Sequence, residues 1–216
     1  GVPWGGNAFD IKNNILFVVT GNPRPALIGI ERPGDNKNSN SLVAIDLQKN
    51  EILWTFQDVR HDLWDFDISS PPILTEMKFD DKVLEVVIVT TKTGNTFVLD
   101  RITGSSYYDI NYKKAPISNI PGEITSSYQI AGGLGKLSSI EFKLKDIDKL
   151  NNESQNYIKE LLKDSTYGWF EAPSFGKKLI TFGVHGGATW PGSALNPKQN
   201  ILYTPINNYP FYLLVE

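Results

Sequence analysis

Short apolar runs, each followed by polar, turn-forming residues, recur along most of the chain. They are rich in β-branched and aromatic side chains, which favour β-strands over helices. We predict strands at residues 15–20, 42–47, 52–56, 83–90, 95–100, 178–183, 201–204 and 211–215. The pattern therefore predicts an all-β fold with one interruption.

That interruption is a long stretch with weak strand signal, which we place at residues 110–176. Within it, residues 146–163 (DIDKLNNESQNYIKELLK) carry apolar side chains partly at helical spacing among polar ones. We predict a surface helix there, inside a long loop and helical insertion. Excursions of this length from a β framework often cover a site.

Two segments repeat one another, SLVAIDLQKNEILWTFQ at 41–57 and NTFVLDRITGSSYY at 95–108. Their aspartates, Asp46 and Asp100, lie 54 positions apart. A period near 50 with about four strands per unit is typical of β-propeller blades. About three or four such blades fit in this length, too few to close a ring, and unpaired edge strands invite aggregation. We therefore expect residues 1–216 to form part of a single β-propeller domain, with the rest of the propeller outside this chain.

Composition removes several classes of function. The net charge of -3 comes without a basic stripe, so nucleic acid is not an expected partner. The chain has no cysteine, which excludes thiolate zinc sites and cysteine nucleophiles within it. Any metal must be held by oxygen ligands or by the two histidines. No apolar run is long enough to cross a bilayer, and residues 1–20 do not look like a signal peptide.

Residues capable of chemistry gather where strands end. The segments are VPWGGNAFD (2–10), TGNPRP (20–25), RPGDNK (32–37), HDLWDFD (61–67), TTKTGN (90–95) and HGGATWPGS (185–193). Each has a structural explanation when taken alone, since tryptophans pack between blades, aspartates cap turns and a lysine can be solvated. Together they supply a flat aromatic surface, a neutral oxygen ligand, a carboxylate and a cation. This set suits a flat, anionic, metal-bound cofactor.

Five motifs carry a family resemblance: TGNPRP, LVAIDLQKNEILWTFQ, HDLWDFDISSPPIL, KTGNTFVLDR and GGATWPGSALNP, in this order. The chain resembles the catalytic domain of the pyrroloquinoline quinone (PQQ) dependent dehydrogenases, a β-propeller with eight blades when complete. It is most similar to the membrane-bound glucose dehydrogenase type, although RPGDNK is more like the alcohol-oxidising branch. The motifs leave out only about residues 110–170.

The resemblance implies roles for individual residues. Trp4 is expected to stack on the PQQ ring, and Asn22 to be a Ca²⁺ ligand through its side-chain oxygen. Asp65 is expected to be the general base, placed at the metal as a further ligand. Lys92 is expected to bond the quinone oxygens, where methanol-oxidising relatives use arginine.

Two further cofactor neighbours are implied with a less certain alignment, Thr189 and Trp190. Within HDLWDFD we expect His61 and Asp62 to hold the loop, with its tryptophan anchored in the core. Asp67 is interpreted as structural. A glutamate that completes Ca²⁺ binding in the alcohol-oxidising branch is expected upstream of this chain.

The activity that the resemblance implies is oxidation of a sugar, polyol or alcohol hydroxyl, with electrons passed to a quinone or cytochrome acceptor. The family works in the periplasm, and a tether to the inner membrane is one arrangement. Two other hypotheses stay open. A non-catalytic propeller scaffold would explain the repeats but not the spacing of Trp4, Asn22, Asp65 and Lys92. A calcium- or sugar-binding, lectin-like propeller would have no need of Lys92.

Overall fold

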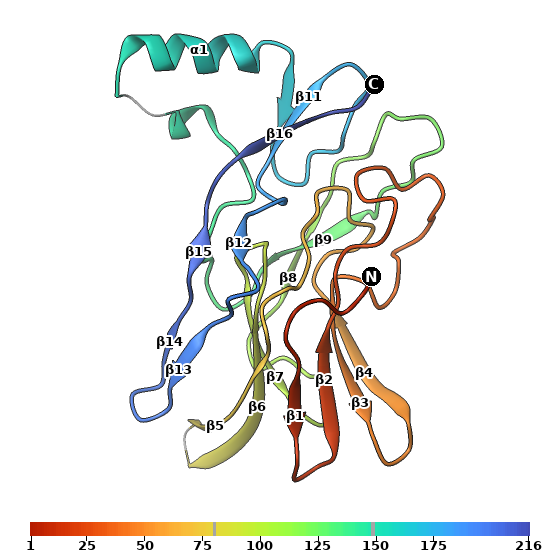
Figure 1. Ribbon diagram of the computed structural model, residues 1–216, viewed down its shortest axis with the longest axis vertical. Coiled ribbons are helices and arrows are strands. Elements are labelled where there is room, and N and C mark those ends of the chain that lie inside the picture. Colours follow the sequence, from red (N-terminus) through yellow and green to blue (C-terminus); the bar gives the residue numbers. More distant parts are fainter. Residues whose placement is uncertain (80, 148–149) are drawn as a thin grey trace.

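β-Strands dominate the computed structural model, which describes residues 1–79, 81–147 and 150–216 (Figure 1). Every segment predicted as a strand contains one, so the all-β prediction is confirmed. The first sheet has the strand order β1 (Ala8–Asp10), β2 (Ile15–Val19), β3 (Ser41–Asp46) and β4 (Glu51–Gln57). Each strand pairs antiparallel with the next, as expected of one blade.

A second antiparallel sheet follows, formed by β5 (Ile73–Phe79), β6 (Lys82–Thr90) and β7 (Thr96–Asp100). Its buried face packs on that of the first sheet around alternate residues of β2 and β6. The cluster comprises Ile15, Phe17, Val19, Leu42, Ala44, Ile68, Val87, Val89, Phe97, Leu99 and Ile130. This period of two is what a pleated strand with one buried face requires.

Trp54 on β4 joins the two sheets. Its Nε1 donates to the carbonyl of Arg101 at 3.1 Å, and its ring lies against Gly104. A Cβ at Gly104 would lie 2.6 Å from Trp54 Cδ2, so only glycine fits under the indole. Arg101 completes the contact, because its Nη1 pairs with Asp10 at 3.1 Å.

The repeated aspartates have a shared local role. Asp10, Asp46 and Asp100 each accept hydrogen bonds from the backbone N–H groups two and three positions later, at 2.8–3.2 Å. The residue four positions after each of them has φ between 54° and 71°, in the left-handed region. This is a hairpin turn closed by an Asx cap. The sequence repeat is thus a repeated turn.

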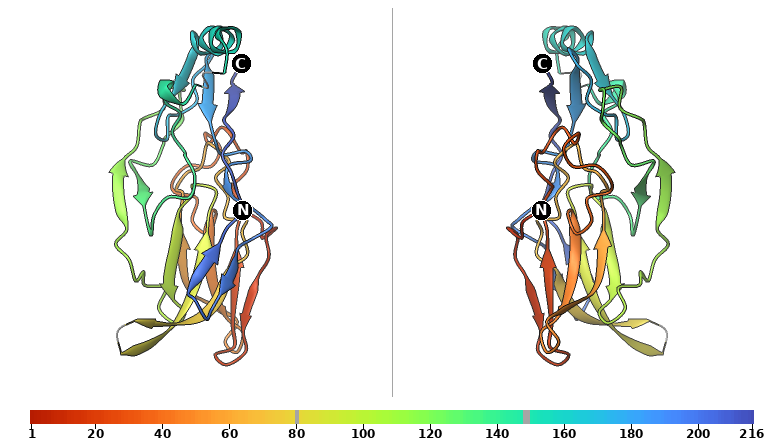
Figure 2. Two further views of the ribbon diagram at one scale, coloured as in Figure 1. Left: turned by 90° about the vertical axis from the view of Figure 1, so that its left-hand side faces the viewer. Right: turned by 90° about the vertical axis from the view of Figure 1, so that its right-hand side faces the viewer.

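The insertion contains more strand than predicted. In chain order it holds β8 (Asn111–Lys114), β9 (Tyr128–Gly132), a 3₁₀ turn (Leu144–Asp146), α1 (Asn152–Leu162) and β10 (Ser165–Tyr167). The helix predicted over 146–163 is confirmed from residue 152 onward, and residues 148–149 of that prediction lie outside the described residues. Asn151 caps α1 by accepting from the Ser154 N–H at 2.8 Å. The helix lies at one end of the molecule, away from the first two sheets (Figures 1 and 2).

The last part of the chain forms β11 (Lys178–Thr181), β12 (Gly187–Ala188), β13 (Ala194–Asn196), β14 (Ile201–Tyr203), β15 (Ile206–Asn207) and β16 (Phe211–Leu214). β11 pairs parallel with β10 and antiparallel with β16. β12 pairs with β15, and β13 with β14. None of the helices described in the structure is both long enough and apolar enough to cross a membrane.

Candidate active site

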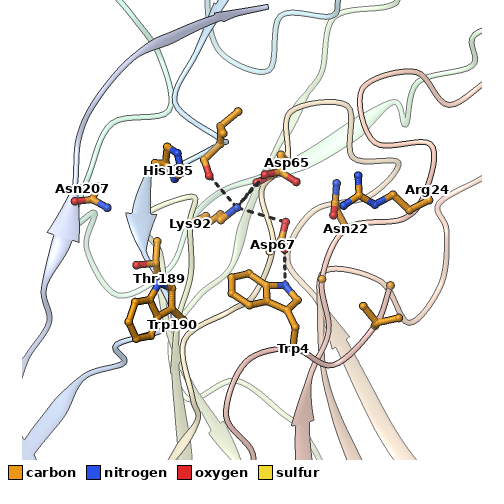
Figure 3. A pocket seen from close by; sticks show the side chains of 14 residues that line it. Trp4, Asn22, Arg24, Asp65, Asp67, Lys92, His185, Thr189, Trp190 and Asn207 are labelled. Carbon is orange, nitrogen blue, oxygen red and sulfur yellow. Dashed lines mark hydrogen bonds and ion pairs between the residues drawn. The ribbon is translucent and has the colours of Figure 1, made fainter.

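One pocket of about 720 Å³ opens where the loops after β2, β4, β6 and β11 meet the N-terminal segment (Figure 3). Every residue that the sequence motifs selected lines it, namely Trp4, Asn22, Asp65, Lys92, Thr189 and Trp190. These residues come from segments far apart in the sequence. The fold therefore brings the selected residues together at the ends of the strands.

Asp62 shapes the loop that carries Asp65. The carboxylate of Asp62 is fully buried and accepts from the N–H groups of Trp64 and Phe66, both at 2.9 Å. Asn40 Nδ2 donates to it at 2.8 Å. Asp65, between the two tethered N–H groups, has φ of 67°, a strained conformation for a residue with a Cβ. Asp62 thus holds the loop, as predicted, and holds Asp65 in its unusual backbone conformation.

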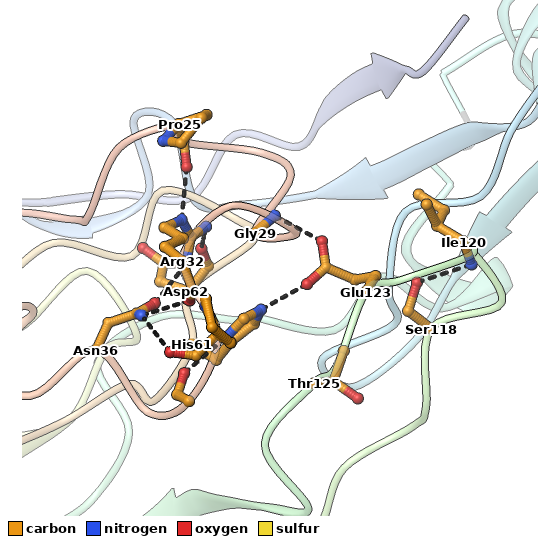
Figure 4. A network of polar contacts seen from close by, with 12 residues as sticks. Pro25, Gly29, Arg32, Asn36, His61, Asp62, Ser118, Ile120, Glu123 and Thr125 are labelled. Carbon is orange, nitrogen blue, oxygen red and sulfur yellow. Dashed lines mark hydrogen bonds and ion pairs between the residues drawn. The ribbon is translucent and has the colours of Figure 1, made fainter.

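The same loop is anchored on two other sides. Trp64 is 2% exposed, and its Nε1 donates to the carbonyl of Glu171 at 2.6 Å, which confirms its predicted place in the core. The ring of His61 is held at both nitrogens, with Nδ1 2.7 Å from the Gly34 carbonyl and Nε2 2.6 Å from Glu123 Oε1 (Figure 4). Glu123 belongs to the insertion, so the insertion supports the loop through this contact with His61.

Lys92 lies at the centre of the pocket and is buried rather than solvated. Its ammonium donates to the Asp65 backbone carbonyl at 2.9 Å, to Asp65 Oδ2 at 3.1 Å and to the Val184 carbonyl at 3.3 Å. Asp67 Oδ1 lies 3.5 Å from it. Burial raises the pKa of Asp65 above its usual value, the nearby Lys92 charge opposes the rise, and Asp67 adds to it.

Asp67, interpreted above as structural, also lines the pocket. Its Oδ2 accepts from Trp4 Nε1 at 2.7 Å, while its Oδ1 faces Lys92. Gly21 makes room for this contact, because a Cβ there would lie 2.9 Å from Trp4 Nε1 and 3.0 Å from Asp67 Oδ2. Trp4 is 47% exposed. Its indole is therefore pinned at one edge and open to the pocket.

The remaining predicted residues form the other walls. Asn22 is 7% exposed, and its Nδ2 has no hydrogen-bond partner within the described part of the chain. Trp190 is 67% exposed, and Thr189 is next to it on the opposite side of the pocket (Figure 3). Gly187 lets this segment approach Lys92, since a Cβ on Gly187 would lie 2.2 Å from the Lys92 carbonyl.

Sequence reasoning missed several lining residues, among them Arg24, His185 and Asn207. Arg24 and His185 lie inside the segments TGNPRP and HGGATWPGS, which were already expected to meet at the site. Their place in these segments could have marked them as pocket residues. His185 is exposed, and its ring centroid lies 5.1 Å from that of Phe211. Asn207 is in a segment with no motif.

Consecutive antiparallel sheets whose loops meet at one pocket are the architecture of part of a β-propeller. The sequence matches, over residues 2–216, the family described as "PQQ: Glucose/ethanol/alcohol dehydrogenase, beta-propeller domain". The chain therefore belongs to this family of PQQ-dependent dehydrogenases, as the motifs predicted. The match includes residues 110–170, which the motifs had left out.

Similar proteins carry this family's activities in their names. The chain is 31% identical to the glycerol dehydrogenase large subunit of Gluconobacter thailandicus, over 97% of the chain and 29% of that protein. It is 30% identical to quinoprotein glucose dehydrogenase A of Acinetobacter calcoaceticus, over 96% of the chain and 27% of that protein. The solved quinohemoprotein alcohol dehydrogenase of Comamonas testosteroni superimposes with a TM-score of 0.62 at 23% identity, over 99% of the chain and 27% of that structure. That structure confirms the propeller fold, and the chain spans less than a third of each of these proteins.

Proposed function

We propose that this chain forms part of a PQQ- and Ca²⁺-dependent dehydrogenase that oxidises a hydroxyl group of a sugar, polyol or alcohol. One observation carries the proposal. Residues chosen for their spacing in the motifs, from Trp4 to Trp190, line a single pocket. The names of the two relatives, glycerol and glucose dehydrogenase, support a hydroxyl substrate of this kind.

The pocket fits a flat anionic cofactor. Its volume of about 720 Å³ lies in the range of small-molecule sites. Trp4 offers an open aromatic face whose orientation is fixed by Asp67, and Lys92 supplies a held positive charge. When bound, PQQ would supply the two-electron acceptor for the reaction. Trp4, Lys92, Thr189 and Trp190 are the residues we propose to hold it.

The donor atoms beside Lys92 also fit a hard cation. Asn22 and Asp65, the proposed ligands, offer oxygen atoms, which Ca²⁺ prefers. Among the described residues, no cluster of three or more His, Cys, Asp and Glu side chains could hold a metal ion by itself. The proposal therefore needs ligands in addition to these, such as the glutamate expected upstream.

Each polar residue of the pocket has a proposed part in the chemistry. Asp65 would take the proton of the substrate hydroxyl, because its side chain is partly exposed to the pocket and its backbone is held by the buried loop. Lys92 would stabilise negative charge in the pocket, since two carboxylates and two carbonyls fix its ammonium in advance. Asp67 would keep the Trp4 ring in place.

The family supports a proposal for the electron acceptor and for the cellular location. We propose that electrons leave to a quinone or cytochrome acceptor and that the protein works in the periplasm, with an inner-membrane tether as one arrangement. The remaining propeller blades would come from outside residues 1–216 and would complete the walls of the pocket.

The first test is Asp65→Asn in the full-length protein, supplied with PQQ and Ca²⁺ and assayed by dye reduction with glucose, glycerol and a panel of alcohols. A general base contributes about 10²–10⁴-fold to rate, so turnover should fall by that factor while PQQ stays bound. Asp109→Asn, at an exposed position outside the pocket, is the matched control and should keep full activity.

The wild type also decides between the hypotheses. Binding of PQQ and Ca²⁺ with dye reduction supports the dehydrogenase, and the preferred substrate identifies the branch. A wild-type protein that binds neither PQQ nor Ca²⁺ would sink the proposal, and the scaffold hypothesis would take its place.

A further inference from the structure

The two cations that line the pocket differ in how they are held. Lys92 is buried among Asp65 and Asp67. Arg24 is exposed, lines the same pocket and makes no ion pair or side-chain hydrogen bond with any other described residue. Figure 3 shows its guanidinium reaching back toward Asn22, on the side away from Trp190. The charge of Lys92 is thus balanced within the protein, and that of Arg24 is open to a ligand.

The backbone that presents Arg24 is fixed, although its side chain is not. A second arginine, Arg32, donates to the carbonyl of Pro25 at 2.7 Å and to that of Ala26 at 3.0 Å (Figure 4). The same guanidinium donates to the Asp62 carbonyl, which ties this segment to the HDLWDFD loop. Because this backbone is already ordered, a ligand that binds the guanidinium of Arg24 does not have to order the loop as well, and less entropy is lost.

A second unused donor comes from the same loop, two positions before Arg24. Asn22 Nδ2 is buried and has no acceptor among the described residues. A buried N–H group without an acceptor is costly, so a ligand oxygen that accepts from it would remove that cost. The planar fork of an arginine binds a carboxylate through two parallel hydrogen bonds, a geometry that a neutral hydroxyl cannot match.

We propose that Arg24, with the amide of Asn22 from the same loop, forms a subsite that binds a carboxylate group. Within the proposed function, this carboxylate belongs either to PQQ or to a hydroxy-acid substrate. In the second case the pocket would favour hydroxy acids over neutral polyols. The inference rests on the proposed function only for the source of the carboxylate.

The test compares wild type, Arg24→Gln and Arg24→Lys in the full-length protein, with Lys37→Gln as a control that removes an exposed positive charge outside the pocket. PQQ affinity is measured first, by quenching of tryptophan fluorescence. With PQQ saturating, kcat/KM is then measured for gluconate, a hydroxy acid, and for sorbitol, its neutral counterpart. Gluconate and sorbitol binding to the PQQ-free protein is measured by calorimetry.

Loss of a charge-assisted, two-bond contact corresponds to about a tenfold or larger change in affinity. A fall of that size in PQQ affinity for Arg24→Gln, partly restored in Arg24→Lys, supports a cofactor carboxylate. Unchanged PQQ affinity with a tenfold fall in kcat/KM for gluconate, and none for sorbitol, supports a substrate carboxylate. The control should match wild type in both measurements.

Unchanged PQQ affinity together with an unchanged gluconate-to-sorbitol ratio overturns the proposal. A wild type that binds no PQQ contradicts the proposed function instead. The calorimetry then decides on Arg24 by itself: gluconate binding that is lost in Arg24→Gln supports the subsite, and gluconate binding that is absent or equal in the two proteins overturns it.

Discussion

The two halves of the HDLWDFD loop share one backbone but differ in how their polar groups are used. In the first half, His61 and Asp62 are 1% and 0% exposed, and each is held by at least two partners. In the second half, Asp65 and Asp67 face the pocket. Asp67 Oδ1 has no hydrogen-bond partner in the described part of the chain and only a 3.5 Å ion contact with Lys92.

The difference indicates that His61 and Asp62 stabilise the loop, whereas Asp65 and Asp67, a few residues later, are available to a ligand. Groups with every polar atom engaged can rigidify a loop, but they have nothing left with which to bind a ligand. Groups left partly unpaired are costly by themselves, and they persist where the surrounding structure forces them. We therefore expect changes in the first half to reduce stability and changes in the second half to reduce ligand binding or rate.

The largest expected loss of stability is at Glu123, the partner of His61. Both carboxylate oxygens of Glu123 are engaged, one by His61 Nε2 at 2.6 Å and the other by the Gly29 N–H. Glu123→Gln would place a side-chain NH₂ group, which cannot accept a hydrogen bond, against one of these two N–H groups inside the core. Breaking a buried pair of this kind costs about 3–5 kcal/mol, to be measured by urea denaturation of the full-length protein.

Glu160→Gln is the matched control, because Glu160 pairs with Lys163 on the exposed face of α1, with both side chains about two-thirds exposed. An exposed ion pair contributes about 0–1 kcal/mol, so this change should be nearly silent. Equal effects of the two substitutions would contradict the idea that the insertion buttresses the loop through Glu123.

The next effect is a dependence of stability on pH. Burial raises the pKa of Asp62 to about 6 from 3.8, despite the opposing hydrogen bonds from Trp64 and Asn40. A carboxyl with a raised folded-state pKa stabilises the fold below its unfolded value, and that contribution is lost as the pH rises through the folded value. The stability of the metal-free wild type should therefore fall by about 2 kcal/mol relative to Asp62→Asn between about pH 4 and 7.

Comparing the two proteins at each pH cancels the titration of all other groups. Asp62→Asn keeps the shape of the side chain but cannot ionise, so its own stability curve should lack this component. A difference between wild type and variant that stays constant from acid to neutral pH would show that Asp62 is not desolvated as the structure has it.

Local patterns predicted the fold better than the contacts between its parts. The repeated turns after Asp46 and Asp100 were visible because the chemistry of an Asx turn lies within five residues. β8 was missed because all of its residues are exposed, so no apolar alternation marks it. β5 was not predicted either, and none of its residues is fully buried.

The same limit applies to the site. Family motifs located Trp4, Asn22, Asp65 and Lys92, which the fold then brought to one pocket. Nothing local marks Asp67 as the partner of Trp4, 63 positions away, or Glu123 as the partner of His61, 62 positions away. Contacts across such distances depend on the packing of whole sheets and loops, which a pattern along the chain does not contain.

The smallest expected loss of stability is at Trp4, and it probes the second half of the loop most directly. Trp4→Phe keeps an aromatic face and removes the N–H that donates to Asp67 at 2.7 Å. Because Trp4 is half exposed, we expect a loss of only about 1 kcal/mol in stability. PQQ affinity should fall by up to about tenfold, since the ring is no longer pinned, and Trp4→Ala should weaken it further by removing the stacking surface. If Trp4→Phe and Trp4→Ala bound PQQ equally poorly, the hydrogen bond to Asp67, and not the aromatic face, would be what Trp4 contributes.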